Sequence, residues 1–451
     1  MRPRPLPLVL ACAVVALSAC DDTAVSPDPD QSAPLAKQVV DATAVDLGRE
    51  LFFDKSLSRN GNQSCAECHS PDFGFSGPKV AINMGGAVYA GSFHQRSGDR
   101  RPPTASYATL SPQLYYDVFE GLWIGGNFWD GRATGWGLGN PAADQAIGPF
   151  LNPVEQALPD AACVIWKIRE GSYADVWRAV YGDAIYGIAF PEQMNQECRK
   201  EPGEVDIPLS DADRDLVNDL YGDVGRTIAA FEGSPEVNQF SSKYDAWKAG
   251  AAEFTEREEW GFELFDGKAR CSACHVLDLS DPSDLLTDFT YDNLGVPANP
   301  ENPIYQRDPD FVDYGLGGFL ARVAANPTDF GFLPDAAMAA GTVSESMGKQ
   351  KVPTLRNTDR KPSVPVTKAF AHNGYFKSLE QIVHFYNTRD VKPTCPGPYS
   401  AAEAIEAGCW PTPEVAENVN ADELGDLGLT ADEEAAVVAF MRTLSDGYRG
   451  D

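Results

Sequence analysis

Apolar residues recur at helical spacing in two stretches of this chain, one near its middle and one near its end. The first stretch contains Leu216, Leu220, Val224, Ile228 and Phe231. The second contains Ala436, Val437, Phe440, Met441 and Leu444. Steps of three and four residues place apolar side chains on one face of a helix. Thr430 and Glu433 have capping-box spacing ahead of the second stretch, so we predict a helix at both places.

Two shorter patterns, GRELF at residues 48–52 and GFELF at residues 261–265, repeat one another. Thr255 and Glu258 have capping-box spacing ahead of the second, so each half of the chain is also predicted to begin with a helix. Between these four helices Gly and Pro are frequent, and few runs alternate apolar with polar residues. The pattern predicts a mainly α protein with long loops and little strand.

Each pair of predicted helices encloses a Cys-x-x-Cys-His pentapeptide, which is typical of c-type haem attachment. The two thiols add to the haem vinyl groups, and the histidine becomes an axial ligand of the iron. A pair of zinc sites or disulfides is the alternative. Zinc prefers four protein ligands, however, and each pentapeptide offers three, while only His94, His372 and His384 remain elsewhere. The predicted haem residues are Cys65, Cys68 and His69 in the first half and Cys271, Cys274 and His275 in the second.

The order of helix, haem motif, loops and helix is the plan of a cytochrome c-like domain, and it occurs twice. The length of 451 residues also favours two domains. Ser, Asn and Pro cluster at residues 233–238, where the first half ends. We therefore predict two tandem cytochrome c-like domains, at residues 41–245 and 246–451, each folded around one covalent c-type haem.

The first twenty residues have the order of a secretion signal: two arginines, an apolar run from Leu6 to Leu17, and Leu-Ser-Ala-Cys ending at Cys20. The tetrapeptide resembles a bacterial lipobox, which implies cleavage before Cys20 and lipidation of its thiol. The apolar run is too short for a permanent transmembrane helix. We predict a lipoprotein signal peptide at residues 1–19, a flexible tether at 20–40, and a lipid-anchored protein on the periplasmic or cell-surface side of a bacterial membrane. An ordinary signal peptide with a chance cysteine is the alternative.

The chain has 66 acidic and 36 basic residues, a formal net charge of −30. This charge repels phosphates, so a nucleic-acid partner is excluded from the prediction. An acidic surface can steer a basic electron-donor protein toward a haem edge. An ordinary solvated surface, or a salt-adapted organism, explains the charge equally well.

Four cysteines remain after those of the signal, the lipid site and the haem motifs are set aside: Cys163, Cys198, Cys395 and Cys409. In an oxidising compartment they are expected to form two disulfides. The sequence permits three pairings. We favour the pairs with short loops, Cys163 with Cys198 and Cys395 with Cys409, because each then lies within one half.

Several segments resemble the bacterial di-haem cytochrome c peroxidases, a family that includes the enzyme that matures the tryptophan cofactor of methylamine dehydrogenase. The matching segments are LGRELFFD at 47–54, FWDGRA at 128–133, Gln145 to Glu155, KVPTLRN at 351–357 and HNG at 372–374. They span nearly the whole mature chain in the same order. The resemblance implies a first haem that reacts with peroxide and a second haem that transfers electrons.

The resemblance also implies a set of residues around the first haem. Peroxide must bind an iron with a vacant position, and a neighbouring group must move a proton from its near oxygen to its far oxygen. Glu155 matches that acid/base, Gln145 matches a second polar group of the pocket, and Pro149 lies between them. A carboxylate at a helix start is the alternative for Glu155. Trp129 matches an aromatic ring between the haems, with Trp136 as a competitor and core packing as the alternative for either.

Two positions depart from most members of the family. Fourteen residues after His372, where many members have an axial Met for the second haem, this chain has Tyr386, the residue type of the cofactor-maturing member. A phenolate stabilises ferric iron and lowers its potential. The alternative is that Tyr386 only packs and that Met338 or Met347 binds the iron. His94 is the candidate for the distal ligand that closes the first iron in many members, but its offset predicts a surface loop and an open iron.

A calcium ion between the domains is a further feature of the family. Thr367 and Ala369 match residues that supply carbonyl oxygens, but Arg101 stands where an Asn side chain is expected. A cation opposite calcium is unfavourable, so the predicted site is incomplete. His372 is expected to bond a haem propionate, and His384 is expected to be a solvated helix residue.

Three functions follow from these interpretations. The first is a di-haem peroxidase that reduces hydrogen peroxide to water with electrons from a small cytochrome or cupredoxin. The second is an oxidase that uses peroxide to form a paired high-valent iron state and oxidises Trp or Tyr of a partner protein. The third is a non-enzymatic electron-transfer cytochrome, which would need both irons six-coordinate. Members of the family are often dimers, so a homodimer is a further expectation.

Overall fold

The structure of the protein, a computed structural model, describes residues 42–205, 207–327, 336–362 and 366–450. The predicted signal peptide at 1–19, the tether at 20–40 and the lipid site at Cys20 lie outside the described residues. Among the described residues no helix is long and apolar enough to cross a membrane. Residues 40–451 form one compact unit.

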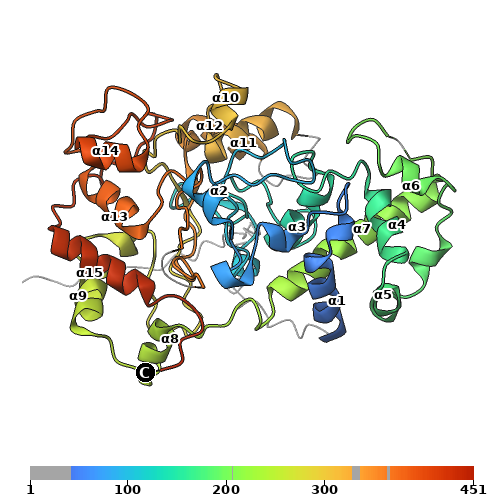
Figure 1. Cartoon of the computed structure of the whole chain (residues 1–451), viewed down its shortest axis with the longest axis horizontal. Helices are drawn as coiled ribbons and strands as arrows, with labels where there is room; N and C mark the ends of the chain where they lie inside the picture. Colours follow the sequence, from blue (N-terminus) through green and yellow to red (C-terminus); the bar gives the residue numbers. More distant parts are fainter. Residues whose placement is uncertain (1–41, 206, 328–335, 363–365, 451) are drawn as a thin grey trace, which may run out of the picture. The chain divides into compact units, whose positions relative to one another are not determined.

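Helices dominate this unit, as the sequence predicts (Figure 1). The longer α-helices are α1 (Ala42–Phe53), α3 (Pro141–Leu151), α4 (Ala161–Arg169), α5 (Ala174–Tyr181), α7 (Asp211–Glu232), α9 (Glu256–Asp266), α11 (Gly315–Ala325), α12 (Ala336–Ser346), α13 (Leu379–Thr388) and α15 (Ala431–Arg442). The shorter ones are α2 (Val80–Met84), α6 (Met194–Glu197), α8 (Lys243–Lys248), α10 (Ile304–Arg307) and α14 (Ala401–Ala407).

Strand is limited, within the described ranges, to two antiparallel ribbons of two strands each. The first pairs β1 (Tyr115–Asp117) with β2 (Leu122–Ile124). The second pairs β3 (Tyr291–Asp292) with β4 (Gln350–Lys351). The haem motifs themselves form single 3₁₀ turns, η3 (Cys65–Glu67) and η7 (Cys271–Ala273).

Two pairs of crossed helices organise the unit: α1 packs on α7, and α9 packs on α15. Each crossing requires a glycine. A Cβ at Gly48 would collide with the carbonyl oxygen of Thr227, and a Cβ at Gly261 would collide with that of Ala436. The repeated G-x-E-L-F pattern of the sequence is therefore explained by close helix approach, because the glycine lets two backbones touch.

The helix pairs stand in two separate apolar cores, at opposite sides in Figure 1. The last residue of the first core is Val237, and the first residue of the second is Tyr244. A third, smaller cluster joins α11 and α12 to β1, β2 and β3. The predicted boundary at residue 245 falls inside α8, whose Tyr244 packs in the second core, and the division into two domains stays a prediction.

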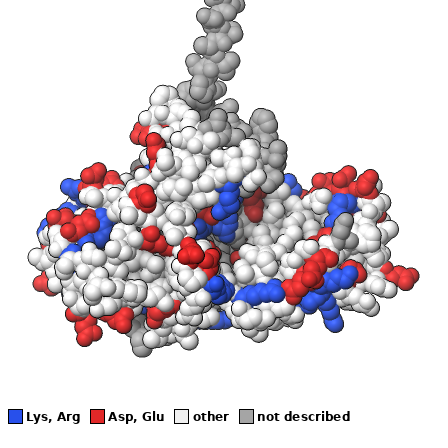
Figure 2. Space-filling view, turned by 90° about the horizontal axis from the view of Figure 1, so that it is seen from above, with Lys and Arg blue, Asp and Glu red and all other residues white. Residues whose placement is uncertain are grey.

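Charged side chains stand on the surface in separate groups. Figure 2 shows one face, on which acidic and basic residues lie next to one another in several groups, with uncharged surface between the groups. Exposed ion pairs such as Arg178 with Asp175 and Asp183 contribute little to stability, because water screens both charges. The acidic surplus therefore affects solubility and association more than folding.

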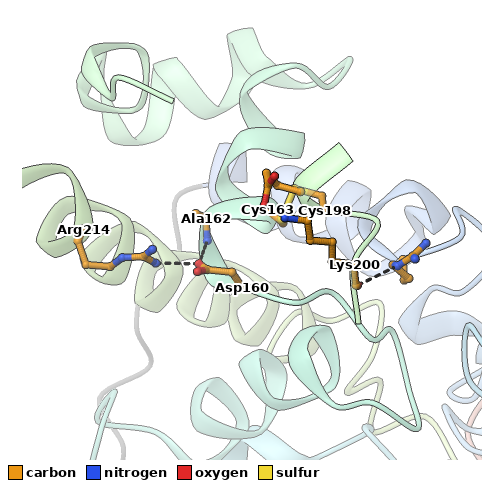
Figure 3. Close-up of a disulfide and its surroundings, with 8 residues drawn as sticks. Asp160, Ala162, Cys163, Cys198, Lys200 and Arg214 are labelled. Atoms are coloured by element: carbon orange, nitrogen blue, oxygen red, sulfur yellow. Dashed lines mark hydrogen bonds and ion pairs between the residues drawn. A yellow bond between two sulfur atoms is a disulfide. The ribbon is translucent and has the colours of Figure 1, made fainter. Parts of the chain in front are cut away.

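Both favoured disulfides are present, so that prediction is confirmed. The Cys163–Cys198 bridge ties α4 to the segment after α6 (Figure 3). Beside it, Asp160 caps α4 by accepting from the amide of Ala162 and pairs with Arg214 of α7 at 2.7 Å. The Cys395–Cys409 bridge closes the loop that contains α14. Each half of the chain therefore has one crosslink.

Candidate haem sites

The two Cys-x-x-Cys-His motifs present their histidines in the same way. Nδ1 of His69 lies 3.1 Å from the carbonyl oxygen of Phe75, and Nδ1 of His275 lies 2.9 Å from that of Leu286. A histidine that donates Nδ1–H to a carbonyl keeps Nε2 free to bind a metal, which is the usual arrangement behind an iron ligand. Burial lowers the pKa of His69, and lowers that of His275 to about 4, so both rings stay neutral at neutral pH.

The loops that hold the histidines also repeat. Phe75 and Leu286 both have left-handed backbone, with φ of 52° and 50°. The Thr104 hydroxyl donates to the Gly74 carbonyl at 2.7 Å, and the Thr354 hydroxyl donates to the Leu285 carbonyl at 2.6 Å. Sequence reasoning missed this second repeat, although the Pro-Thr dipeptides at 103–104 and 353–354 carry its signal.

The first motif opens on a cavity of about 270 Å³. The predicted residues that line it together with His69 are Cys65, Cys68, Trp129, Gln145, Pro149 and Glu155. Gln145 and Pro149 lie one turn apart on α3, which places them on the same face of that helix. The structure thus brings together all the residues expected at the first haem.

Glu155 lies in the turn that follows α3. Its amide donates to the carbonyl of Asn152 at 3.0 Å, and its own carbonyl accepts from the amide of Ser92 at 2.6 Å. Burial raises the pKa of Glu155, while the nearby Arg132 cation lowers it. A carboxyl with a raised pKa suits an acid/base, because it holds a proton more readily than an ordinary carboxylate does.

The second motif opens on a smaller cavity of about 160 Å³. Tyr386 of α13 lines it together with Cys271, Cys274 and His275, and burial raises the pKa of its phenol. Met338 packs in the third cluster instead, and Met347 is not among the described residues that line the cavity. Tyr386 is therefore better placed than either methionine to face the second haem.

His372 also lines the second cavity, where its Nε2 is buried and lacks a hydrogen-bond partner among the described residues. Buried polar atoms are rarely left without a partner, so this nitrogen fits the expected bond to a haem propionate. His384 lies on α13, as expected, but it is less exposed to solvent than expected. It is half-buried, with Nδ1 2.9 Å from Glu434 and Nε2 2.6 Å from Lys392. Its two partners, Glu434 on α15 and Lys392 after α13, shield part of the side chain from solvent.

Trp129 lies where the two cavities meet and lines both of them. Its ring nitrogen donates to the carbonyl of Arg101 at 2.9 Å, and its carbonyl accepts from the amide of Lys351 at 2.8 Å. The Arg101 guanidinium lies 5.2 Å from the ring centroid. Trp136 packs in the third cluster instead and donates to the carbonyl of Leu114.

The residues present do not fit a calcium ion. Calcium takes six to eight oxygen ligands. The carbonyl of Thr367 already accepts from the Asn83 amide at 3.1 Å, and the side chain of Ala369 lines the first cavity. The Arg101 guanidinium, which replaces the expected Asn, donates to the carbonyl of Ala371 at 3.1 Å. The residue at the expected Asn position therefore supplies a positive charge instead of an oxygen ligand.

Other charged residues of the cavities were missed. Lys351 and Lys368 are buried, and burial lowers the pKa of each ammonium to about 7. Lys351 belongs to the KVPTLRN segment, but nothing in its local pattern predicts burial. Glu232 ends the apolar face of α7 and lines the first cavity. His94 is exposed, 3.5 Å from Asn62, and is not among the described residues that line the first cavity, as expected.

The haem expectation fits these observations. The four motif cysteines are free thiols, each cavity exposes one histidine with Nδ1 engaged, and both cavities are bounded by buried side chains. The Methylamine utilization protein MauG of Paracoccus denitrificans aligns with this chain at 34% identity over 421 residues, covering 92% of the chain and 91% of that protein. A family model described as di-haem cytochrome c peroxidase matches residues 42–253. The chain belongs to the di-haem cytochrome c peroxidase family.

Other similarities lie in the same family. Cytochrome-c peroxidase IdrP1 of Denitromonas iodatirespirans is 26% identical over 98% of this chain and 92% of its own length. Among solved structures, the diheme peroxidase BthA of Burkholderia thailandensis superposes with a TM-score of 0.67 at 26% identity, covering 90% of this chain and 86% of that one. The protein is accordingly an oxidoreductase of the cytochrome-c peroxidase type, and membership implies two c-type haems.

Proposed function

We propose that the protein reduces hydrogen peroxide to water at the first haem, with electrons that arrive through the second. The observation that carries the proposal is the presence of Glu155 and Gln145 in the same cavity as His69. When bound, a haem with a vacant position accepts peroxide and takes up its oxidising equivalents.

The side chains of the first cavity supply the proton chemistry. Glu155 accepts a proton from the iron-side oxygen of peroxide and returns it to the far oxygen, which leaves as water. Gln145 donates from its amide to hold peroxide toward Glu155, and Pro149 shapes the wall behind it. Because His94 is exposed, we propose that no second histidine would bind the first iron in the oxidised protein.

Electrons enter at the second haem in this proposal, and Trp129 is the aromatic side chain between the two sites. The donor is a small cytochrome or cupredoxin, and the protein is anchored through Cys20 on the outer side of a bacterial membrane, in the periplasm or at the cell surface. We also propose that the protein forms a homodimer. The domain division at residue 245 assigns one haem to each half, where His69 would hold the first iron and His275 and Tyr386 would hold the second.

A second function is favoured by one residue. Tyr386 faces the second cavity, and a tyrosinate ligand favours the oxidised state of that haem. Such a site suits an enzyme that holds two oxidising equivalents and oxidises Trp or Tyr of a partner protein. The 34% identity to a methylamine utilization protein over nearly the whole chain supports this alternative.

The test is to mix hydrogen peroxide with the fully oxidised holoprotein and, separately, with the half-reduced holoprotein. We would follow the visible and near-infrared spectra and the consumption of peroxide. Rapid reaction of the oxidised form with a new near-infrared band would favour the protein-oxidising enzyme. Turnover with a reduced cytochrome or cupredoxin would favour the peroxidase. Absence of any reaction with peroxide in both forms would overturn both functions.

A further inference from the structure

A second buried carboxyl lines the first cavity, and the proton chemistry above does not use it. Glu232 is the last residue of α7 and is 3% exposed. Its Oε2 has no hydrogen-bond partner among the described residues, and its side chain lines the cavity that contains His69 and Glu155. A buried carboxyl without a partner is costly, so its place in the cavity calls for an explanation.

A comparison of the two helix crossings shows which residue of the second half corresponds to Glu232. Gly48 packs against Thr227 and Phe231 of α7, and Gly261 packs against Ala436 and Phe440 of α15. Both pairs on the receiving helices are four residues apart, so α7 and α15 are in the same register. The residue after Phe231 is Glu232, and the residue after Phe440 is Met441. Met441 lines the second cavity, as Glu232 lines the first.

Burial raises the pKa of Glu232 to about 8. None of the described cations offsets this effect. The charged residues of α1, Asp46, Arg49 and Glu50, are exposed, and Arg49 pairs with Glu236. The 3₁₀ turn Ala108–Leu110, next to the end of α7, carries no charged residue.

The cavity that Glu232 lines is also lined by Cys65 of η3, by Glu155 of the turn after α3 and by the uncharged Gln145 of α3. The other charged residues of its lining are Asp99, Arg100, Arg101, Arg132, Lys351, Arg356 and Lys368, and none of them offsets the effect of burial on Glu232. Glu232 and Glu155 both disfavour the Cys65 thiolate. That thiol becomes a thioether when haem is attached and then no longer titrates. The first haem would occupy this cavity, and its charge would change by one when the iron is reduced.

We propose that Glu232 is the redox-linked proton acceptor of the first haem. Glu232 balances the charge of the haem and is a positioning residue, not a catalytic one, because it need not contact peroxide. When the first iron gains one electron from a reductant, the carboxylate of Glu232 gains one proton from solvent; when the electron leaves, the proton leaves. The positive charge lost at the iron is thereby replaced by a proton at Glu232.

This coupling gives the first haem a potential that depends on pH. Oxidised iron carries one more positive charge than reduced iron, so it stabilises the carboxylate and lowers the pKa of Glu232 relative to the reduced state. Between the two pKa values the potential falls as pH rises, by up to about 59 mV for each pH unit, since one proton accompanies one electron.

The experiment is a spectroelectrochemical titration of both haems in the full-length holoprotein at pH values from below to above 8. In the wild type the potential of the first haem should depend on pH around this value. Glu232→Gln, which keeps the shape of the side chain and cannot ionise, should reduce the slope of the first haem and leave that of the second unchanged. Met441→Glu is the matched variant, and it should make the slope of the second haem steeper than in the wild type.

Haem propionates also titrate, and the Glu232→Gln variant separates their contribution, because they stay in it. A slope for the first haem that is the same in the wild type and in Glu232→Gln would overturn the proposal. If that variant fails to load two haems, the infrared difference spectrum of reduced minus oxidised wild type decides instead. A protonated-carboxyl C=O band that grows on reduction supports the proposal, and its absence overturns it. Neither readout depends on peroxide turnover.

Discussion

The two candidate haem cavities hold their motif histidines in the same way but differ in the other side chains that line them. Behind His69 and His275 the chain uses the same parts: a carbonyl at Nδ1, a left-handed residue, a Thr–carbonyl bond and a glycine crossing. Elsewhere in the linings, the first cavity has Gln145, Glu155 and Glu232, whereas the second has Tyr386 and Met441 together with its own acidic residues, Asp292, Asp313, Glu414 and Glu423. The chain thus holds a motif histidine in the same surroundings in both halves, and the other side chains of each cavity determine its chemistry.

The largest effect is expected from the carboxyl that faces peroxide. Glu155→Gln should slow peroxide cleavage by about 10²-fold or more, because an amide cannot accept the proton. Single-turnover mixing with hydrogen peroxide measures this rate. Glu423→Gln is the matched control, because Glu423 lines the second cavity and should leave the rate near normal. An equal loss in the two variants would mean that the first cavity is not the reactive one.

The crosslinks of the two halves should also differ. The Cys163–Cys198 bridge closes a separation of 35 residues and the Cys395–Cys409 bridge one of 14. By loop-closure entropy, replacing both cysteines of a pair by serine should lower the free energy of unfolding by about 4 and about 3 kcal/mol, respectively. Urea unfolding of the two double variants measures these losses. A larger loss at the shorter loop would show that factors other than chain entropy dominate.

The second haem should respond selectively to Tyr386. Tyr386→Phe removes the phenol oxygen, so the potential of the second haem should rise and its spectrum should change while the first haem stays the same. Resonance Raman spectra and a redox titration would follow both haems. Tyr375→Phe is the control, since Tyr375 is buried in the same core and donates to the Tyr399 carbonyl. Identical spectra for wild type and Tyr386→Phe would exclude ligation.

The smallest effect is expected from removing divalent cations. Because Arg101 already places a positive charge beside the Ala371 carbonyl, EDTA should leave both potentials and the peroxide rate unchanged. Arg101→Asn restores the side chain expected of a calcium ligand, and this variant should become sensitive to EDTA. The same titrations measure both proteins. Loss of wild-type activity in EDTA that calcium restores would contradict the assignment.

The parts of the fold that local sequence determines were predictable. The apolar faces of α7 and α15 could be predicted from the helical spacing of their apolar residues. The two disulfides could be predicted from the short loops between their cysteines. The ribbon of β3 and β4 could not be predicted, because each strand has two residues and they pair across about sixty residues of chain. Such pairing leaves no local alternation to detect.

Of the candidate sites, the attachment residues and the first cavity were predictable because motif and resemblance fixed them. The buried charges were not. Glu232 follows an apolar stripe, and only the register of two helix crossings shows that it faces a cavity. The position of Arg101 over Trp129 depends on a contact between distant segments. Burial of a charged residue is a property of the folded surroundings, so its own neighbours in sequence carry no signal for it.

The wall between the cavities has a consequence for engineering the protein. Side chains of both halves face both cavities there: Arg101 and Trp129 come from the first half, and Lys351 and Phe370 come from the second. A chain cut near residue 245 would separate these four side chains, and each fragment would keep its haem-attachment motif but lose part of its lining. Two isolated fragments should therefore be poorer haem proteins than the intact chain, and grafting one half onto a relative would require the wall to be redesigned with it.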